Sequence, residues 1–95
     1  MDTVQGIADR VVEEVVAFLA SQPLNKRLEH IPTPSRLDME TLLRDLHIDY
    51  RDRTVLGIRL TQHGHCIALP VQVTAHWRTI GDIVETVIRF GPPTS

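Results

Sequence analysis

Residues 42–60 read LLRDLHIDYRDRTVLGIRL, and this stretch decides the fold that we expect for the chain. Asp49 has the side chain of a helix N-cap, because its carboxylate can accept hydrogen bonds from the free amides of a first helical turn. Tyr50 would then be the first residue of a helix that runs to about Gln62. The positive end of that helix dipole is a natural place to hold an anion such as a phosphate.

Two glycines help to place this central helix. Gly57 costs about 1 kcal/mol relative to alanine in a helix interior, which predicts a close packing contact at this position. Gly64 is expected to end the helix in the left-handed conformation. The residues expected on the buried side of the helix are Val55 and Ile58, with Leu56 or Leu60.

An amphipathic helix is predicted from Asp2 to about Ala20, because apolar residues recur there every three or four positions. Asp9, Glu13 and Glu14 lie off the apolar stripe and are expected to face water. Residues 22–35 contain three prolines and are expected to form a long loop. The predicted stripe consists of Val4, Ile7, Ala8, Val11, Val12, Val15, Phe18 and Leu19.

Three shorter elements complete the predicted helices. Ser35 can cap a short helix that runs to about Arg44. Pro70 is expected to open a short helix over residues 70–75. Thr79, with Asp82 in a capping-box position, begins the last helix. The residues expected to point inward are Leu37, Leu42, Leu43 and Leu46 before the central helix, and Ile80, Ile83, Val84, Val87 and Ile88 in the last one.

Length and composition fit one domain over residues 1–95. Hydrophobic residues make up 42% and charged residues 23%, which is ordinary for a soluble globular protein. The formal net charge of −2 argues against a strong attraction to nucleic acid. No apolar run is long enough for a signal peptide or a membrane span, and the one cysteine suits a reducing compartment. We therefore expect a cytoplasmic monomer.

Three stretches resemble the acyl carrier proteins and the related peptidyl carrier domains. Residues 45–51, DLHIDYR, follow the frame of the family's D-L-G-x-D-S-L motif. Residues 63–70, HGHCIALP, are similar to its phenylalanine-glycine-x-x-I-P run, and residues 77–84, WRTIGDIV, to the T-V-G-D-x-V opening of its last helix. Tyr50 and Ile80 lie thirty residues apart, close to the family's spacing. The resemblance covers about residues 37–90 and implies an all-α, acyl-carrier-protein-like four-helix bundle. Its long loop, with an extra short helix, would lie between the first two main helices.

Tyr50 stands where the family has the serine that carries its 4′-phosphopantetheine arm. A transferase moves that arm from coenzyme A, with magnesium, onto a primary hydroxyl, and a rigid phenol ring would carry its hydroxyl far beyond that position. Ser35 superficially resembles the attachment site but lies forty-five residues before Ile80. The resemblance therefore implies the shape of a carrier without its arm, and 4′-phosphopantetheine is expected to be absent.

Carrier proteins usually present acidic side chains along their second helix to basic partner enzymes. In this chain the stretch from Tyr50 to Leu60 has three arginines against one aspartate, a local charge of +2. This charge predicts an acidic docking patch on a protein partner, although such arginines can also be merely solvated. The predicted partner-binding residues are Tyr50, Arg51, Arg53, Arg59 and Trp77. Trp77 is alternatively an apolar lid over the ends of the last two helices.

These features predict a non-catalytic docking, adaptor or regulatory subunit for enzymes of fatty-acid, polyketide or nonribosomal-peptide type. Its partners would be synthases, ligases or acyltransferases, and not nucleic acid or a membrane. One alternative is a genuine acyl carrier protein of a specialised pathway. Another is a small metal- or DNA-binding regulator, which the arginines of the central helix support in part.

Residues 63–66, HGHC, contain ligand types that zinc prefers. The remaining histidines, His30, His47 and His76, stand at no recognisable spacing from them, so no metal site is predicted. Cys66 is expected to be a small buried residue and not a nucleophile. The sequence contains no phosphate-binding glycine loop, hydrolytic triad or dinucleotide fingerprint, so no enzymatic activity is predicted.

Overall fold

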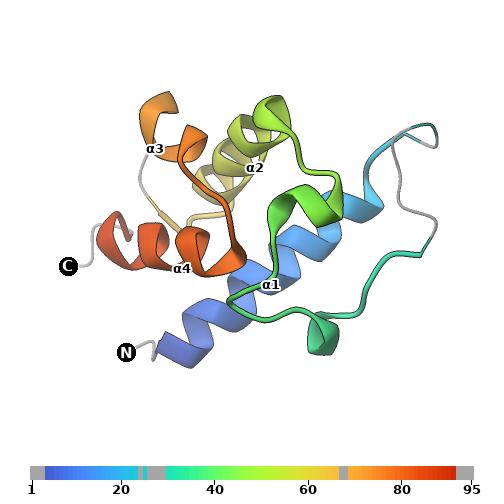
Figure 1. Ribbon diagram of the computed structural model, residues 1–95. Helices are drawn as coiled ribbons and strands as arrows, with labels where there is room; N and C mark the ends of the chain where they lie inside the picture. The colour runs from blue at the N-terminus through green and yellow to red at the C-terminus, as the bar shows by residue number, and fades with distance from the viewer. Residues whose placement is uncertain (1–3, 24, 26–29, 67–68, 92–95) are drawn as a thin grey trace.

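The computed structural model describes residues 4–23, 25, 30–66 and 69–91. Within these residues the chain is mostly helical, and its only β-type pairing is an isolated antiparallel bridge between Leu42 and Thr79. The predicted all-α class is confirmed (Figure 1). The helices are α1 (Val4–Ala20), α2 (Tyr50–Gln62), α3 (Val71–Ala75) and α4 (Ile80–Arg89), with the 3-10 turns η1 (Pro34–Arg36) and η2 (Leu43–Leu46).

Helix α1 packs against both α2 and α4, and α3 packs on α2 (Figure 1). The predicted α1 stripe is buried over most of its length, and only Val4 at its start is largely exposed. Helix α4 is buried along its predicted stripe except at Ile88, whose predicted burial is wrong because it is 47% exposed. The buried residues of the two helices are Ala8, Val11, Val12, Val15, Phe18 and Leu19 in α1, and Ile80, Ile83, Val84 and Val87 in α4. The predicted start of α1 at Asp2 lies outside the described residues.

The predicted N-caps of α2 and α4 are present. The Asp49 carboxylate accepts from the Asp52 amide at 2.9 Å, and the Asp52 carboxylate accepts in return from the Asp49 amide at 3.2 Å. Thr79 and Asp82 form the same reciprocal capping box at the start of α4, each bond being 3.2 Å long. Each box satisfies two amides that the helix itself leaves without partners, so these four residues fix where α2 and α4 begin.

Gly57 faces α3, as the predicted close contact requires. A Cβ atom added to Gly57 would lie 2.7 Å from Cγ2 of Thr74, which is closer than real Cβ contacts. The core side of α2 consists of Asp52, Leu56, Gly57 and Leu60. Val55 and Ile58, predicted to be buried, are instead 50% and 52% exposed. With Gly57 turned inward, the helix period turns both of these side chains outward.

The short helix predicted from Ser35 to Arg44 is wrong. The Asp38 carboxylate accepts from the Glu40 amide and from the Thr41 hydroxyl, and the Asp38 amide donates back to Thr41 Oγ1 at 3.0 Å. Such local side-chain bonds offer the backbone an alternative to a helix. Residues 39–43 are further tied to the start of α4, because Gly81 N–H donates to the Met39 carbonyl at 2.9 Å. Leu43 and Leu46 are buried as predicted, whereas Leu37 and Leu42 are only partly buried.

The contact at Gly57 gives a stability prediction. We expect Gly57→Ala to lower the free energy of unfolding by about 1 kcal/mol or more, because the clash with Thr74 exceeds the gain in helix propensity. Combining it with Thr74→Ser, which removes Cγ2, should recover most of the loss. Chemical denaturation of both single variants and the double variant measures the coupling. A more stable Gly57→Ala protein would show that α2 and α3 are not in close contact.

Candidate functional site

The predicted attachment position lies at the start of α2. Tyr50 is the first residue of the helix and is 57% exposed. Three residues earlier, His47 has φ 59° and ψ 29°, in the left-handed region that glycine favours. Between them Ile48 is buried, and its amide donates to the Leu43 carbonyl at 3.0 Å. The chain therefore enters α2 through a fixed turn that holds the phenol at the surface.

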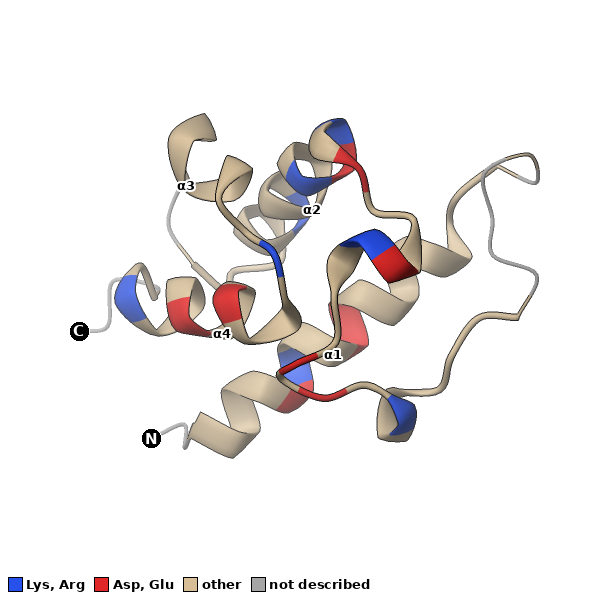
Figure 2. Cartoon of the chain, in the orientation of Figure 1, with Lys and Arg blue, Asp and Glu red and all other residues tan. Residues whose placement is uncertain are grey.

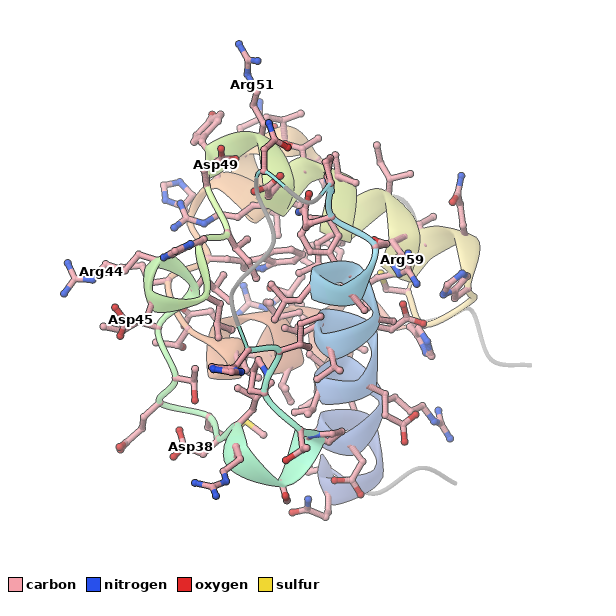
Figure 3. The ribbon with its side chains drawn as sticks, turned by 90° about the vertical axis from the view of Figure 1, so that its right-hand side faces the viewer. Asp38, Arg44, Asp45, Asp49, Arg51 and Arg59 are labelled. Carbon is pink, nitrogen blue, oxygen red and sulfur yellow. The ribbon has the colours of Figure 1, made fainter. Side chains whose placement is uncertain are left out.

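The other residues predicted to bind a partner have different surroundings. Arg51 is exposed and points away from the body of the molecule (Figure 3). Arg53 is half-buried, and its Nε atom is buried with no hydrogen-bond partner among the described residues. Arg59 lies beside α1, where its Nε donates to Oε2 of Glu14 at 2.9 Å (Figure 3). The predicted arginine face is therefore split, and only its first part is open.

Trp77 is 2% exposed, so its prediction as a partner-binding residue is wrong. Its indole Nε1–H donates to Thr86 Oγ1 at 2.8 Å, and its ring reaches the neighbourhood of Gly57. Burying a tryptophan with its one donor satisfied is favourable for packing. The alternative prediction, an apolar residue that covers the junction of the last two helices, agrees with this burial.

An open groove between α2 and α3 was not predicted. Ile58 and Val71, each about half exposed, lie on its two sides, and its volume is about 160 Å³. Val55 extends the exposed apolar surface along α2. Helix α3 carries no charged residue (Figure 2). The remaining lining residues are Thr54, Gly57, Thr61, Gln62, Leu69 and Thr74. Together with Tyr50 and Arg51, this gives α2 an exposed side that is apolar with a basic beginning.

A second constellation, which we call the Glu14 cluster, consists of Glu14, Arg59, His63 and His65. Glu14 Oε1 lies 2.5 Å from Nδ1 of His63 and 3.2 Å from Nε2 of His65, while Oε2 accepts from Arg59. The Glu14 side chain is only 13% exposed. The prediction that Glu14 faces water is therefore wrong.

The end of α2 brings these histidines to α1. Gly64 has φ 77°, and its amide donates to the Thr61 carbonyl at 3.1 Å. The His65 amide donates to the Leu60 carbonyl at 3.0 Å, which completes a Schellman motif. This reversal turns His63 and His65 toward the same carboxylate. The predicted left-handed glycine is confirmed, and the convergence that it produces was missed.

The electrostatics of the cluster favour an ionised glutamate. Burial alone would raise the pKa of the Glu14 carboxyl. Hydrogen bonds from His63, Arg59 and His65 outweigh that effect and hold the pKa below its ordinary value of 4.5. Glu14 is therefore a fixed anion near neutral pH, with donors on both of its oxygens.

Cys66 follows the cluster directly but is chemically separate from it. It is 4% exposed, and burial raises the pKa of its thiol despite the contact with the Thr61 hydroxyl. A raised pKa lowers the thiolate fraction and so the nucleophilicity near neutral pH. The predicted buried position of Cys66 is confirmed.

The searches against known proteins found no match: no family model, no curated protein and no solved structure resembles this chain closely enough to be reported. Among the described residues, no helix has both the length and the apolar character that crossing a membrane requires.

The Glu14 cluster gives a second stability prediction. We expect Glu14→Gln to lower the free energy of unfolding at pH 7 by about 1–2 kcal/mol. The reason is that the hydrogen-bond donors of Arg59, His63 and His65 lose their anionic partner in a partly buried site. A chelator is present in the measurement, so that bound metal ions do not contribute. The exposed neighbour Glu13→Gln is the matched control and should cost less than about 0.5 kcal/mol.

The pH dependence has a definite sign. Since the pKa of Glu14 is lower in the folded chain, its stabilisation is complete above the ordinary value of 4.5 and is lost as the pH falls through the folded value. The difference between wild type and Glu14→Gln should therefore shrink below pH 4.5. A constant difference down to strongly acidic pH would contradict the ion-pair assignment.

Proposed function

We propose that this chain is a carrier-protein-like domain without a phosphopantetheine arm, which docks as an adaptor or regulatory subunit on synthases, ligases or acyltransferases. The observation that carries the proposal is the position of Tyr50. It is exposed, is the first residue of α2, and follows the capping Asp49. This is the place of the attachment serine in the motif that residues 45–51 resemble.

Two backbone features support the resemblance. The motif has glycine where this chain has His47, and the backbone at His47 is left-handed with φ 59°. The glycine of the last motif corresponds to Gly81, where an added Cβ would lie 2.9 Å from the Met39 carbonyl oxygen. These two glycines of the family pattern thus fall where this backbone favours or needs one. The order of a long helix, a long connection, α2, a short α3 and α4 also fits a carrier-like bundle.

The exposed surface of α2 supports docking. Tyr50 and Arg51 are exposed at its start, and Val55 and Ile58 continue along it as half-exposed apolar side chains. Aromatic and arginine side chains are the types most enriched at the energetic centres of protein interfaces. A partner with an apolar site bordered by acidic residues would match this surface.

Loading of the chain tests the proposal. We expect no mass increase when wild-type protein is incubated with a permissive phosphopantetheinyl transferase, Mg²⁺ and coenzyme A. Tyr50→Ser should gain one phosphopantetheine group, because it restores a primary hydroxyl at the start of α2. Intact mass spectrometry measures both results, and peptide mapping locates the group.

Tyr50→Ala is the matched control for this experiment and should stay unloaded. A second control combines Tyr50→Ser with Ser35→Ala and should load as well as Tyr50→Ser alone. Loading of the wild type would mean that the chain is a working carrier. If Tyr50→Ser is folded but stays unloaded, the likeness of residues 45–51 to the carrier motif has no functional meaning.

Charge reversal tests the docking surface. Binding of the wild-type chain to purified carrier-dependent synthases, ligases and acyltransferases is measured by biolayer interferometry at low and high salt. For any that binds, Arg51→Glu should weaken binding by about 1 kcal/mol and flatten its salt dependence. Arg36→Glu, an exposed reversal in η1, should leave binding unchanged. Equal losses in both variants would reflect net charge, and no binding by the wild type would count against docking.

A further inference from the structure

We propose that Glu14, His63 and His65 form a binding site for a divalent transition metal, for which Zn²⁺ is the best chemical match. Their ligand atoms, one carboxylate oxygen and two imidazole nitrogens, all lie within 4.8 Å of one another. Glu14 lies in α1, and the two histidines lie in the turn that follows α2, so they are 49 and 51 positions away from it in the sequence. The site goes beyond the proposed docking function and does not depend on it.

Two of the separations between ligand atoms can be compared with those of a tetrahedral site. Ligands about 2.0–2.1 Å from zinc lie about 3.3 Å from one another. The separation of 3.2 Å between His65 Nε2 and Glu14 Oε1 already has this value. The separation of 2.5 Å between His63 Nδ1 and the same oxygen has to widen by less than about 1 Å. The His63 side chain is 46% exposed, so its ring has room for that adjustment.

The set of donors points to the type of metal. Two imidazoles and one carboxylate form the ligand set of open zinc sites, which keep a fourth position for water or another ligand. Calcium and magnesium instead prefer sites made of oxygen atoms. Metal binding displaces the proton that each ring nitrogen shares with the carboxylate. A neutral ring takes up that proton on its other nitrogen, and a doubly protonated ring releases it to solvent. The exposed edge of His63 provides a path to solvent.

Arg59 has the position of an outer hydrogen-bond partner. Its Nε holds Oε2 of Glu14 at 2.9 Å and leaves Oε1 directed at the two histidines. Carboxylates that bind metals are commonly oriented in this way by a second group. The backbone also contributes, because the Schellman motif around Gly64 fixes both histidines relative to α2, which itself packs on α1. Much of the ordering that a metal would otherwise impose is thus already present in the fold.

The competing explanation is that these four side chains form an ion-pair contact between α1 and α2 and bind no metal. That role needs no metal and predicts no selectivity for one. The two roles therefore differ in what they predict for binding of the metal itself, and the experiment measures this directly.

The test uses the full chain, purified without a histidine tag and freed of metal by a chelator. Co²⁺ is added as the spectroscopic probe, and Zn²⁺ affinity is measured by competition with a chromophoric chelator. We expect one metal per chain, intense visible Co²⁺ bands of four-coordinate geometry, and a Zn²⁺-dependent rise in the melting temperature. His63→Ala, His65→Ala and Glu14→Gln should each weaken Zn²⁺ binding by about tenfold or more, and Arg59→Gln by about tenfold.

His47→Ala and His76→Ala are the matched controls, since both remove exposed histidines outside the cluster. They should change the affinity less than twofold. Denaturation with chelator present verifies that each variant folds. If Glu14→Gln is too unstable to be measured, His63→Ala still tests the site, because it removes a half-exposed side chain. The proposal is overturned if wild type binds no metal, if the controls lose as much affinity as the cluster variants, or if a cobalt–thiolate band shows Cys66 to be a ligand.

Discussion

Burial of the apolar stripe of α1 holds the main helices of the described chain together. Helices α2 and α4 both pack on α1, and α3 packs on α2. Val11 and Val15 at the middle of the stripe are almost completely buried. Each fully buried side chain of this kind contributes about 1.5–3 kcal/mol. Among the described residues, this stripe contributes to the same core cluster as the buried side chains of α2 and α4.

Features determined within one helical turn could be predicted from the sequence. The N-cap at Asp49, the capping box of Thr79 and Asp82, the left-handed Gly64 and the close contact at Gly57 each depend on a residue type at one position in a helix. The conformation of residues 35–44, which were wrongly predicted to form a helix, depends on contacts that helix propensity does not describe. Asp38 and Thr41 hydrogen-bond locally, and the segment is then held by the start of α4, a partner about forty residues away in the sequence. Propensity alone does not contain that pairing.

The phase of α2 and the Glu14 cluster were missed for related reasons. Apolar residues of α2 lie on several faces of the helix, so their spacing does not show which of them face the core. The position of Gly57 is a signal that could have identified the buried face. Glu14 stands three residues after Val11 and four before Phe18, a spacing that places it beside the buried stripe. That position was a usable signal for burial. Its convergence with two histidines about fifty residues away could not be predicted, because it depends on the packing of α2 on α1.

The Glu14 cluster also changes what α2 can offer a partner. This helix has a local charge of +2 in the sequence, but part of the positive charge is paired with an acidic side chain inside the structure. Arg59 is bonded to Glu14, and Asp52 serves in the capping box. The open positive charge is therefore concentrated near Arg51, beside Tyr50. Since α2 has 13 residues and is about 20 Å long, this docking end lies far from the histidines at the other end. The two ends of α2 therefore differ chemically. The end near Tyr50 has an exposed positive charge, and at the other end the charge of Arg59 is paired with Glu14 of α1.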